Sequence, residues 1–418
     1  MTGGVAPRPT IAVLGTFDTK GIEHAFVAEA IRDRGCTPLV IDASPVPGPL
    51  PPQLAAFECL RVRGDAGLAA ADRGTAVAVV AAEAEALVTA LTRSGQIQGV
   101  IALGGSGGTA IATAAMRSLP IGLPKLMVST LAGGDVSAFV GTSDIVMVPS
   151  LVDVAGLNRV SRQVFLQAAA AVCAMAEAHL AAAHDTHARP LVVASMFGNT
   201  TRCVDHARGI LEQAGYEVLV FHATGTGGRL MEAIIASGIV AGVLDITTTE
   251  WADELVGGIL GAGPHRLETA ARLGVPAVVA PGCLDMVNFG PQETVPARFR
   301  DRTFFEHSPQ VTLMRTTAAE CNELGRIVAE KLSASVGPVC VEIPRRAISV
   351  ISAAGQPFAD AAADRALFEA LRGHLRPDIR CTEHDLEIND PAFAARCANQ
   401  LLALLDGGHA AKRPRDRG

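Results

Sequence analysis

The segment Val100-Ile101-Ala102-Leu103-Gly104-Gly105-Ser106-Gly107-Gly108-Thr109 decides the fold of the N-terminal half. Its apolar start predicts a buried strand, and the helical pattern of residues 110–116 predicts a strand, a glycine turn and a helix in succession. Glycines let backbone N–H groups converge without obstruction by Cβ, and the start of a helix adds the positive end of its dipole. The segment therefore predicts an anion-binding loop, in which Ser106 and Thr109 would add hydroxyl donors.

The loop matches neither of the common phosphate-binding motifs. It lacks the lysine of G-x-x-x-x-G-K-[ST], and its glycines do not have the G-x-G-x-x-G spacing. A tight turn without a ligand is the alternative interpretation. Four glycines in the five positions 104–108 exceed what a turn requires, which favours ligand binding.

Working outward, short apolar runs followed by glycine-bearing turns and helical patterns recur along the chain, which is typical of α/β proteins. Strands are expected at residues 11–15, 39–42, 99–103, 125–129, 145–149, 191–195, 218–222, 242–246, 277–280, 338–343 and 349–352. A polar break at residues 184–190 separates an N-terminal domain, residues 1–185, from a C-terminal domain, residues 190–418. We expect two Rossmann-like, doubly wound domains with mostly parallel sheets and a cleft between them.

The two halves align without a gap at a constant offset of 180 residues. Phe17 then falls on Phe197, Gly35 on Gly215, and Leu39 on Leu219. The identities are few, so they indicate a shared strand, helix and strand unit and an ancient duplication, and not a solenoid.

The composition limits the class of protein. Hydrophobic residues make up 49% of the 418 residues and aromatic residues only 4%, which suits parallel strands covered by Ala-rich helices. A net charge of −7 argues against a nucleic-acid partner. Nine cysteines without a C-x-x-C pair, and an N-terminus without a secretory pattern, predict a cytoplasmic protein. No membrane partner is expected, because the Ala-rich run 168–183 is too short to span a bilayer.

The loop after the first strand, residues 15–21, is a second candidate for nucleotide binding. Lys20 would meet phosphate, Asp18 would hold Mg²⁺ through water, and the hydroxyls of Thr16 and Thr19 would bond phosphate oxygens. The alternative is that Asp18 or Thr19 only caps the following helix. Thr130 and Ser143, on loops beside predicted strands, are two further candidates, and both segments fit turns equally well.

The C-terminal half has its own glycine loop, residues 224–229, which predicts a second anion site. Acids, a thiol and an imidazole follow or flank its strands: Asp245, Glu250, Cys283, Asp285 and His307. Such residue types on loops after strands would serve acid, base or nucleophile chemistry. For Cys283 the alternative is an inert buried thiol, and for His307 a surface position.

Several long segments of this chain resemble one known family, the ATP-binding family typified by the tomato mosaic virus resistance protein of tomato. The resemblance rests on LGTFDTKG (14–21), ALGGSGGTAIATAAMRSLPIGLPKLMVST (102–130), GTSDI (141–145), DVAGLNRVSR (153–162), FHATGTGGRLMEA (221–233), LDITTTEWADELVGG (244–258) and PGCLDMVNFGP (281–291). It covers residues 10–404 and implies ATP binding by the loop at 104–109, a two-domain Rossmann-like region and a homodimer.

Two functions of different classes follow from these patterns. The first is an ATP-binding protein with a regulatory or interaction role, in which nucleotide is the partner. The second is an enzyme that acts on a small-molecule substrate at the C-terminal loops, with nucleotide as substrate or effector. Converging acids favour the enzyme, and the absence of a complete catalytic signature favours the first.

Overall fold

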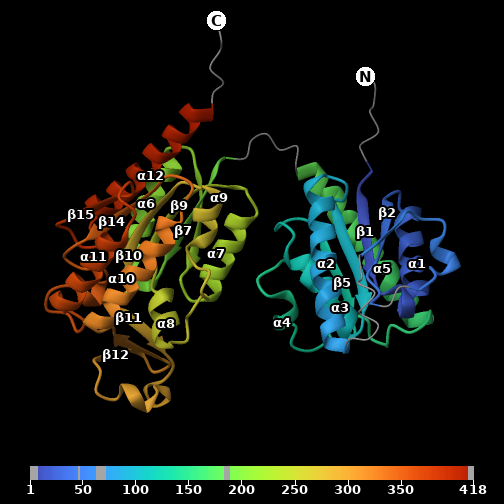
Figure 1. Ribbon diagram of the computed structural model, residues 1–418, viewed down its shortest axis with the longest axis horizontal. Coiled ribbons are helices and arrows are strands. Elements are labelled where there is room, and N and C mark those ends of the chain that lie inside the picture. Colours follow the sequence, from blue (N-terminus) through green and yellow to red (C-terminus); the bar gives the residue numbers. More distant parts are fainter. Residues whose placement is uncertain (1–7, 46–47, 63–71, 183–188, 413–418) are drawn as a thin grey trace, which may run out of the picture. The chain divides into compact units, whose positions relative to one another are not determined.

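The computed structural model describes residues 8–45, 48–62, 72–182 and 189–412. The chain divides into two compact units, residues 1–187 and residues 188–418, hereafter unit 1 and unit 2 (Figure 1). Each unit contains a six-stranded, all-parallel sheet with helices on both faces. The predicted class, two Rossmann-like α/β domains, is confirmed.

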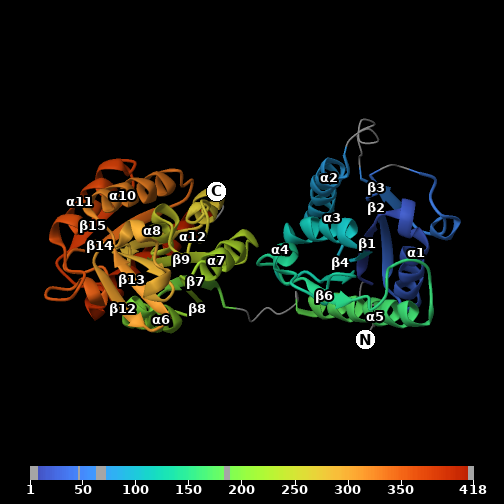
Figure 2. The ribbon, with the colours of Figure 1, turned by 90° about the horizontal axis from the view of Figure 1, so that it is seen from below.

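The sheet of unit 1 has the order β3-β2-β1-β4-β5-β6, the strand order of dinucleotide-binding folds. Its strands are β1 (Thr10–Gly15), β2 (Thr37–Asp42), β3 (Cys59–Arg61), β4 (Gly99–Gly104), β5 (Lys125–Ser129) and β6 (Val146–Pro149). Its helices are α1 (Phe17–Asp33), α2 (Arg73–Arg93), α3 (Ser106–Arg117), α4 (Ser137–Val140) and α5 (Arg159–Ala182). Helices α1 and α5 cover one face of the sheet, and α2 and α3 cover the other (Figure 2).

The central strands of unit 1 are buried on both faces, which explains their continuous apolar sequence. Ile11 and Val13 of β1 point toward α1 and α5, whereas Ala12 and Leu14 point toward α2 and α3. This alternation fixes the register of β1 against β4, in which Leu14 lies opposite Ala102.

The sheet of unit 2 has the order β15-β14-β10-β9-β7-β8. Its strands are β7 (Leu191–Met196), β8 (Glu217–His222), β9 (Val240–Thr247), β10 (Ala277–Gly282), β14 (Val339–Pro344) and β15 (Arg380–His384). Its helices are α6 (Thr201–Gln213), α7 (Thr226–Ala236), α8 (Glu250–Val256), α9 (Glu268–Leu273), α10 (Ala318–Ser333), α11 (Ala361–His374) and α12 (Pro391–Lys412). Helices α6 and α12 pack on one face, and α7, α10 and α11 on the other.

A small antiparallel sheet follows β10 and was not expected from the sequence. Its order is β11-β13-β12, with β11 at Met286–Phe289, β12 at Phe304–Ser308 and β13 at Val311–Arg315. The strand predicted at residues 349–352 is wrong, because the structure has a 3₁₀ turn at Val350–Ser352. Ser349 caps this turn by accepting a hydrogen bond from the backbone N–H of Ser352, and that bond replaces a strand ladder.

Residues 180 positions apart lie in equivalent elements of unit 1 and unit 2. Strand β2 at Thr37–Asp42 maps onto β8 at Glu217–His222 without a shift. The aligned glycines Gly35 and Gly215 both have positive φ, 85° and 94°, just after α1 and α6. Each glycine therefore ends its helix in the left-handed conformation that side chains disfavour.

Helices α2 and α5 are long and apolar enough to cross a membrane, by length and composition alone. Helix α5 runs from Arg159 to Ala182 and so extends at its N-terminal end beyond the Ala-rich run 168–183, which by itself is too short to span a bilayer. Both helices pack one face against the sheet of unit 1, where Val80 and Phe165 are buried. This arrangement is typical of soluble α/β domains.

Helices α10 and α11 approach closely at Gly325, and this contact tests the packing of unit 2. A Cβ on Gly325 would lie 2.6 Å from the Leu367 carbonyl oxygen and 2.8 Å from the Cβ of Ala370. We expect Gly325→Ala to lower the free energy of unfolding by about 1–3 kcal/mol in urea titrations. Gly209→Ala on α6 is the control, because its Cβ would meet nothing within 4 Å. This variant should gain about 0.5–1 kcal/mol, and equal effects of the two changes would contradict the packing.

Candidate functional site

The switch point of the unit 1 sheet lies between β1 and β4. The chain leaves β1 toward β2 on one side, and it continues from β4 toward β5 on the other. Ligands of open α/β sheets bind at such a point, beyond the carboxyl ends of the strands. The two loops that the sequence proposed for nucleotide, which begin at Thr16 and Gly105, start at these two strand ends.

The glycine loop leads directly into the first turn of α3. Gly105 occupies the N-cap position and has no side chain to cap the helix. The N–H of Thr109 bonds the Gly105 carbonyl at 2.8 Å. Among the described residues, the N–H groups of Ser106, Gly107 and Gly108 have no hydrogen-bond acceptor. Three backbone donors and the positive end of a twelve-residue helix therefore converge at the switch point.

The glycines of this loop have different roles. A Cβ on Gly104 would lie 3.0 Å from the backbone of Gly108, so Gly104 permits the close approach of β4 to α3. A Cβ on Gly105 would have its nearest neighbour, Thr130 Oγ1, at 3.8 Å, and one on Gly107 would have Arg73 at 3.7 Å. These are ordinary van der Waals contacts, so a Cβ at Gly105 or Gly107 would fit without displacing its neighbours.

The hydroxyl groups proposed for this site divide into buried and accessible ones. Thr109 is fully buried, and its Oγ1 lies 2.7 Å from the Oγ of Ser129, which ties α3 to the end of β5. Thr130 is exposed beside Gly105. The Oγ of Ser143 is buried and has no partner among the described residues. Thr130 is thus available to a ligand, whereas Thr109 has a structural role.

The first turn of α1 is already capped from within the protein. The N–H groups of Phe17 and Asp18 donate to the Oγ of Ser44 at 2.8 and 3.1 Å. The Ser44 hydroxyl in turn donates to the buried carboxylate of Asp42 at 2.5 Å. The α1 terminus consequently offers a ligand fewer free donors than the α3 terminus. The cap lies 25 residues or more from these amides in sequence, so local capping patterns do not reveal it.

Side chains of the 15–21 loop make their own local contacts. The ammonium group of Lys20 donates to the carbonyl of Val154, and the Thr19 hydroxyl lies 3.3 Å from a carboxylate oxygen of Asp18. Thr16 and Thr19 face each other, with 3.4 Å between their hydroxyl oxygens. Asp18 and Thr19 are exposed. No group of three or more potential metal ligands occurs in the described part of the chain.

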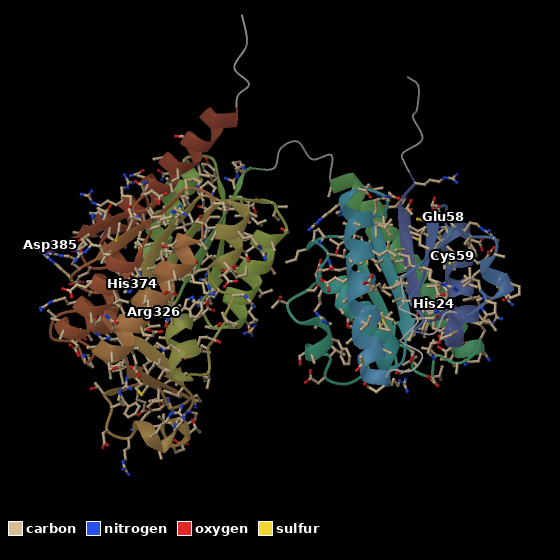
Figure 3. The ribbon with its side chains drawn as sticks, in the orientation of Figure 1. His24, Glu58, Cys59, Arg326, His374 and Asp385 are labelled. Atoms are coloured by element: carbon tan, nitrogen blue, oxygen red, sulfur yellow. The ribbon has the colours of Figure 1, made fainter. Side chains whose placement is uncertain are left out.

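Gly15 is needed because His24 of α1 packs against the end of β1 (Figure 3). A Cβ on Gly15 would lie 2.0 Å from His24 Nε2. Burial lowers the pKa of His24, and its Nδ1 lies 2.7 Å from the Lys20 carbonyl oxygen. The imidazole is thus neutral and holds the first turn of α1 in place.

Arg73 is a candidate that the sequence interpretation missed. It is the first residue of α2, it is exposed, and its guanidinium approaches the position of Gly107. Only the pairing of α2 with α3 across one face of the sheet brings it to the glycine loop. An arginine binds phosphate through several N–H donors at once.

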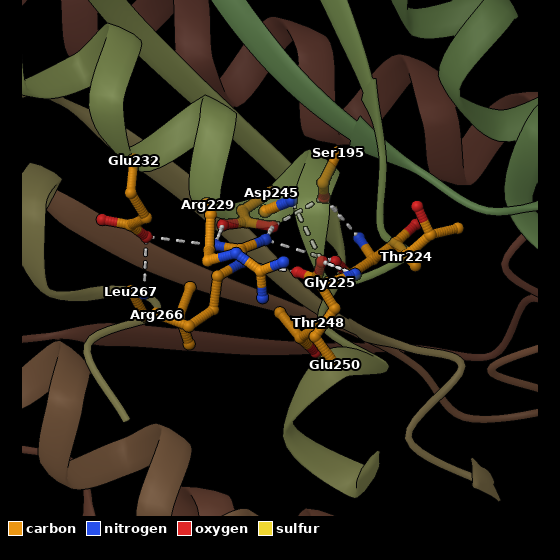
Figure 4. A network of polar contacts seen from close by, with 12 residues as sticks. Ser195, Thr224, Gly225, Arg229, Glu232, Asp245, Thr248, Glu250, Arg266 and Leu267 are labelled. Atoms are coloured by element: carbon orange, nitrogen blue, oxygen red, sulfur yellow. Dashed lines mark hydrogen bonds and ion pairs between the residues drawn. The ribbon is translucent and has the colours of Figure 1, made fainter. Parts of the chain in front are cut away.

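The second glycine loop is occupied by a side chain of the protein (Figure 4). The N–H groups of Gly225 and Gly228 donate to Oε1 of Glu250 at 2.7 and 3.0 Å. Glu250 is 1% exposed, and its other oxygen accepts a bond from Arg266 at 2.8 Å. A carboxylate thus fills the anion-binding position that the sequence predicted for a ligand.

Arg266 links Glu250 to the centre of the sheet. Its guanidinium binds both carboxylate oxygens of Asp245 at 2.6 and 2.7 Å, and it is 2% exposed (Figure 4). The Ser195 hydroxyl donates to Asp245 at 2.6 Å and accepts from the Thr247 N–H at 2.9 Å. Asp245 and Glu250, both proposed as catalytic residues, are therefore joined in one buried ion-pair network, the Arg266 network.

The remaining proposed catalytic residues lie elsewhere. Cys283 is fully buried with φ of 61°, and burial raises the pKa of its thiol. Asp285 is also fully buried, accepts a bond from Ser349 at 2.7 Å, and has its pKa raised by burial. His307 is exposed on β12. No hydrogen bond or ion pair between described residues joins these three to the Arg266 network.

Comparison with known proteins places the chain in a family. Residues 9–181 and 189–405 match the models of the N-terminal and C-terminal domains of the uncharacterised protein family UPF0261. The chain belongs to the UPF0261 family. Similar relatives include a UPF0261 protein of Clostridium tetani, 45% identical over 95% of this chain and 99% of its own length.

Two tomato proteins are also relatives of this UPF0261 chain. The ToMV resistance protein Tm-1(GCR237) of Solanum lycopersicum is 41% identical over 79% of this chain and 45% of its own length. The ToMV susceptible protein tm-1(GCR26) is 37% identical over 95% of this chain and 56% of its own length. The relationship to the tomato protein that the sequence suggested is thereby confirmed as shared membership of UPF0261, whereas ATP binding stays a prediction.

Several solved structures match at low similarity. They include a putative UDP-N-acetylglucosamine 2-epimerase from Listeria monocytogenes, with 12% identity, a TM-score of 0.23 and coverage of 65% of this chain and 79% of that one. Acinetobacter baumannii MurG matches with 10% identity, a TM-score of 0.24 and coverage of 97% and 100%. At these scores the matches support no statement about function.

Removing the Glu250 carboxylate should destabilise unit 2 of this UPF0261 protein. In Glu250→Ala, two amides and part of Arg266 lose a buried acceptor, so we expect a loss of about 3–5 kcal/mol in the free energy of unfolding. Sulfate should restore part of the loss, because the emptied loop offers the donors of an anion site. Glu254→Ala, an exposed change on the same helix, is the control for thermal unfolding with and without sulfate. Equal behaviour of the two variants would contradict the assignment.

The stability of unit 2 should depend on pH through Asp253. Burial raises its pKa to about 7, although the N–H and side-chain amide of Asn288 donate to it at 2.8 and 2.7 Å. The unfolded chain releases this proton near pH 4, before the folded chain does, so stability falls as pH rises from about 4 to about 7. We expect Asp253→Asn to flatten urea-unfolding curves over this range, whereas exposed Asp301→Asn should not. An unchanged pH profile in Asp253→Asn would be the contrary result.

Proposed function

We propose that this protein binds a nucleoside triphosphate, ATP with Mg²⁺, at the switch point of unit 1, and that it has a regulatory or interaction role. The observation that carries the proposal is the set of three unpaired N–H groups at Ser106, Gly107 and Gly108. They lie at the start of α3, where open α/β sheets bind their ligands. The resemblance to an ATP-binding family supports the choice of ATP.

The contrast with unit 2 supports the proposal independently. The two glycine loops have similar sequences, and each leads into a helix. In unit 2 the loop amides bind Glu250, whereas the donors of the unit 1 loop have no acceptor among the described residues. This difference suggests that an external anion accepts hydrogen bonds from the amides of the unit 1 loop.

The side chains near the loop extend this assignment. Arg73 would contact phosphate oxygens from α2, and exposed Thr130 would add a hydroxyl. Asp18 would hold Mg²⁺ through water, since its exposed carboxylate follows the neighbouring strand β1. Lys20 would have to leave the Val154 carbonyl to reach phosphate. Gly104 and Thr109 would shape the loop without touching the ligand.

The proposal includes a cytoplasmic homodimer, as composition and resemblance suggest.

The alternative, an enzyme with chemistry at Asp245, Glu250, Cys283, Asp285 and His307, has less support. Two of these side chains are tied up in the Arg266 network, and two others are fully buried. General acid or base catalysis needs titratable groups within reach of one substrate.

Isothermal titration calorimetry with ATP·Mg²⁺ tests the site. Replacing Gly105 and Gly107 together with Val should abolish binding, because the added side chains would occupy the space in front of the amides without a clash at Cβ. Arg73→Gln should weaken binding by about tenfold or more, the range of a charge-assisted hydrogen bond. Adenosine should bind far more weakly than ATP.

Arg93→Gln is the matched control, because Arg93 is exposed at the opposite end of α2. Its affinity for ATP should equal that of the unmodified protein. Unchanged affinity in the Gly105/Gly107 double variant, or equal affinities for adenosine and ATP, would remove the loop from the binding site.

A further inference from the structure

A cavity lies in unit 2, away from the Arg266 network. It has a volume of 630 Å³, within the range of about 300–1,000 Å³ that is usual for small-molecule sites. It is bounded by α11, by the carboxyl ends of β14 and β15, and by the loop around the 3₁₀ turn at Val350–Ser352. Figures 1 and 2 both show α11 beside β14 and β15. We call it the α11 cavity.

One face of α11 supplies much of the lining. Asp364, Phe368 and Arg372 follow one another at a spacing of four residues, with Arg365 and Glu369 beside them. Residues three and four apart on a helix share a face, so one stripe of α11 presents polar groups of both signs and an aromatic ring.

The wall of the cavity holds a carboxylate that is built into the protein. Asp364 is 9% exposed, and its Oδ1 accepts a bond from Arg315 at 2.5 Å. Its Oδ2 accepts no hydrogen bond from the described residues and keeps some solvent-accessible surface. Because Asp364 lines the cavity, this oxygen is open to it. Arg315 also donates to the Phe358 carbonyl at 2.8 Å and is 5% exposed. Asp364 is therefore held in a fixed position with one oxygen free.

The cationic groups of the cavity are only partly neutralised. Arg345 and Arg372 share a single carboxylate, Glu383, at 3.7 and 2.5 Å. Arg346 pairs with Asp385, which lies at the surface of the unit (Figure 3). Arg365 forms no ion pair with any residue that the structure describes. Donors for an anionic group are thus available in the same cavity as the free oxygen of Asp364.

The balance of charge limits the ligand. Four arginines and four acidic side chains line the cavity: Arg345, Arg346, Arg365, Arg372, Asp360, Asp364, Glu369 and Glu383. A polyphosphate would meet four carboxylates, and a simple cation would meet four guanidinium groups, so each would be repelled by part of the lining. A dipolar ligand without net charge matches both halves.

We propose that the α11 cavity binds a zwitterionic amino carboxylate, an amino acid or a short peptide. Asp364 holds the ammonium group, and Arg365, together with the Arg345 and Arg372 pair, holds the carboxylate. Phe368 and the alanines of the adjoining loop contact the apolar part of the ligand. This site is independent of nucleotide binding in unit 1.

Calorimetry and thermal shift on the full chain, without nucleotide, test the proposal. The probes are the common amino acids, taken singly, and the dipeptide alanylalanine. At least one zwitterion should bind with one site per chain. For a zwitterion that binds, the matched analogues without the amino group or without the carboxylate should lose about tenfold or more in affinity. Absence of binding by every zwitterion at millimolar concentration, or equal binding of the analogues, would overturn the proposal.

Two variants locate the site. Asp364→Asn keeps an acceptor for Arg315 but removes the charge, and Arg365→Gln alters an exposed side chain that has no ion pair to lose. Both variants should bind the zwitterion with an affinity lower by about tenfold or more. Arg365→Gln should also leave the melting temperature of the protein unchanged. Arg396→Gln, an exposed change on α12 outside the cavity, is the control and should bind normally. Unchanged affinity in Arg365→Gln would contradict the assignment.

Discussion

The backbone N–H groups at the start of a helix need acceptors, and this requirement organises the candidate sites of both units. Three helices that follow parallel strands differ in whether the protein itself meets this requirement. Helix α1 uses the hydroxyl of Ser44, and α7 uses the carboxylate of Glu250. Helix α3 has no such acceptor among the described residues. The same sequence feature, glycines before a helix, therefore produces a closed structural junction in unit 2 and an open one in unit 1.

The closed junction explains how unit 2 tolerates charges in its interior. Arg266 is surrounded by carboxylates from three elements, and the loop amides of α7 complete the hydrogen bonding of Glu250. Burial raises the pKa of Glu250, while the positive charge of Arg266 opposes that shift. A network of this kind fixes the positions of β9, α7 and α8 relative to one another. It leaves little freedom for Asp245 or Glu250 to exchange protons with a substrate.

The α11 cavity differs from the Arg266 network, because some of its charged groups lack a full set of ion-pair partners. Asp364 is fixed by one bond and keeps one oxygen accessible, while two arginines divide a single glutamate. Unit 2 thus separates a buried polar network at β9 from an accessible polar surface at β14 and β15. A ligand can reach titratable groups at the accessible surface, whereas those of the buried network are shielded from it.

The sequence by itself determined the α/β class, most of the parallel strands and the glycine loop of α3, because apolar runs and glycine turns are local signals; the edge strands β3 and β15 were missed. It also identified the family. The antiparallel sheet at β11-β13-β12 was missed; the pairing of β11 with β13 joins segments separated by irregular chain, whereas β12 and β13 form a hairpin. Only the tertiary structure decided which loops are filled. Ser44 caps α1 from 26 residues away from Asp18, and Glu250 reaches Gly225 from 25 residues away, so no local pattern contains the partner. Arg73 and the α11 cavity likewise arise from helices packed across a sheet, where distance in space is unrelated to distance along the chain.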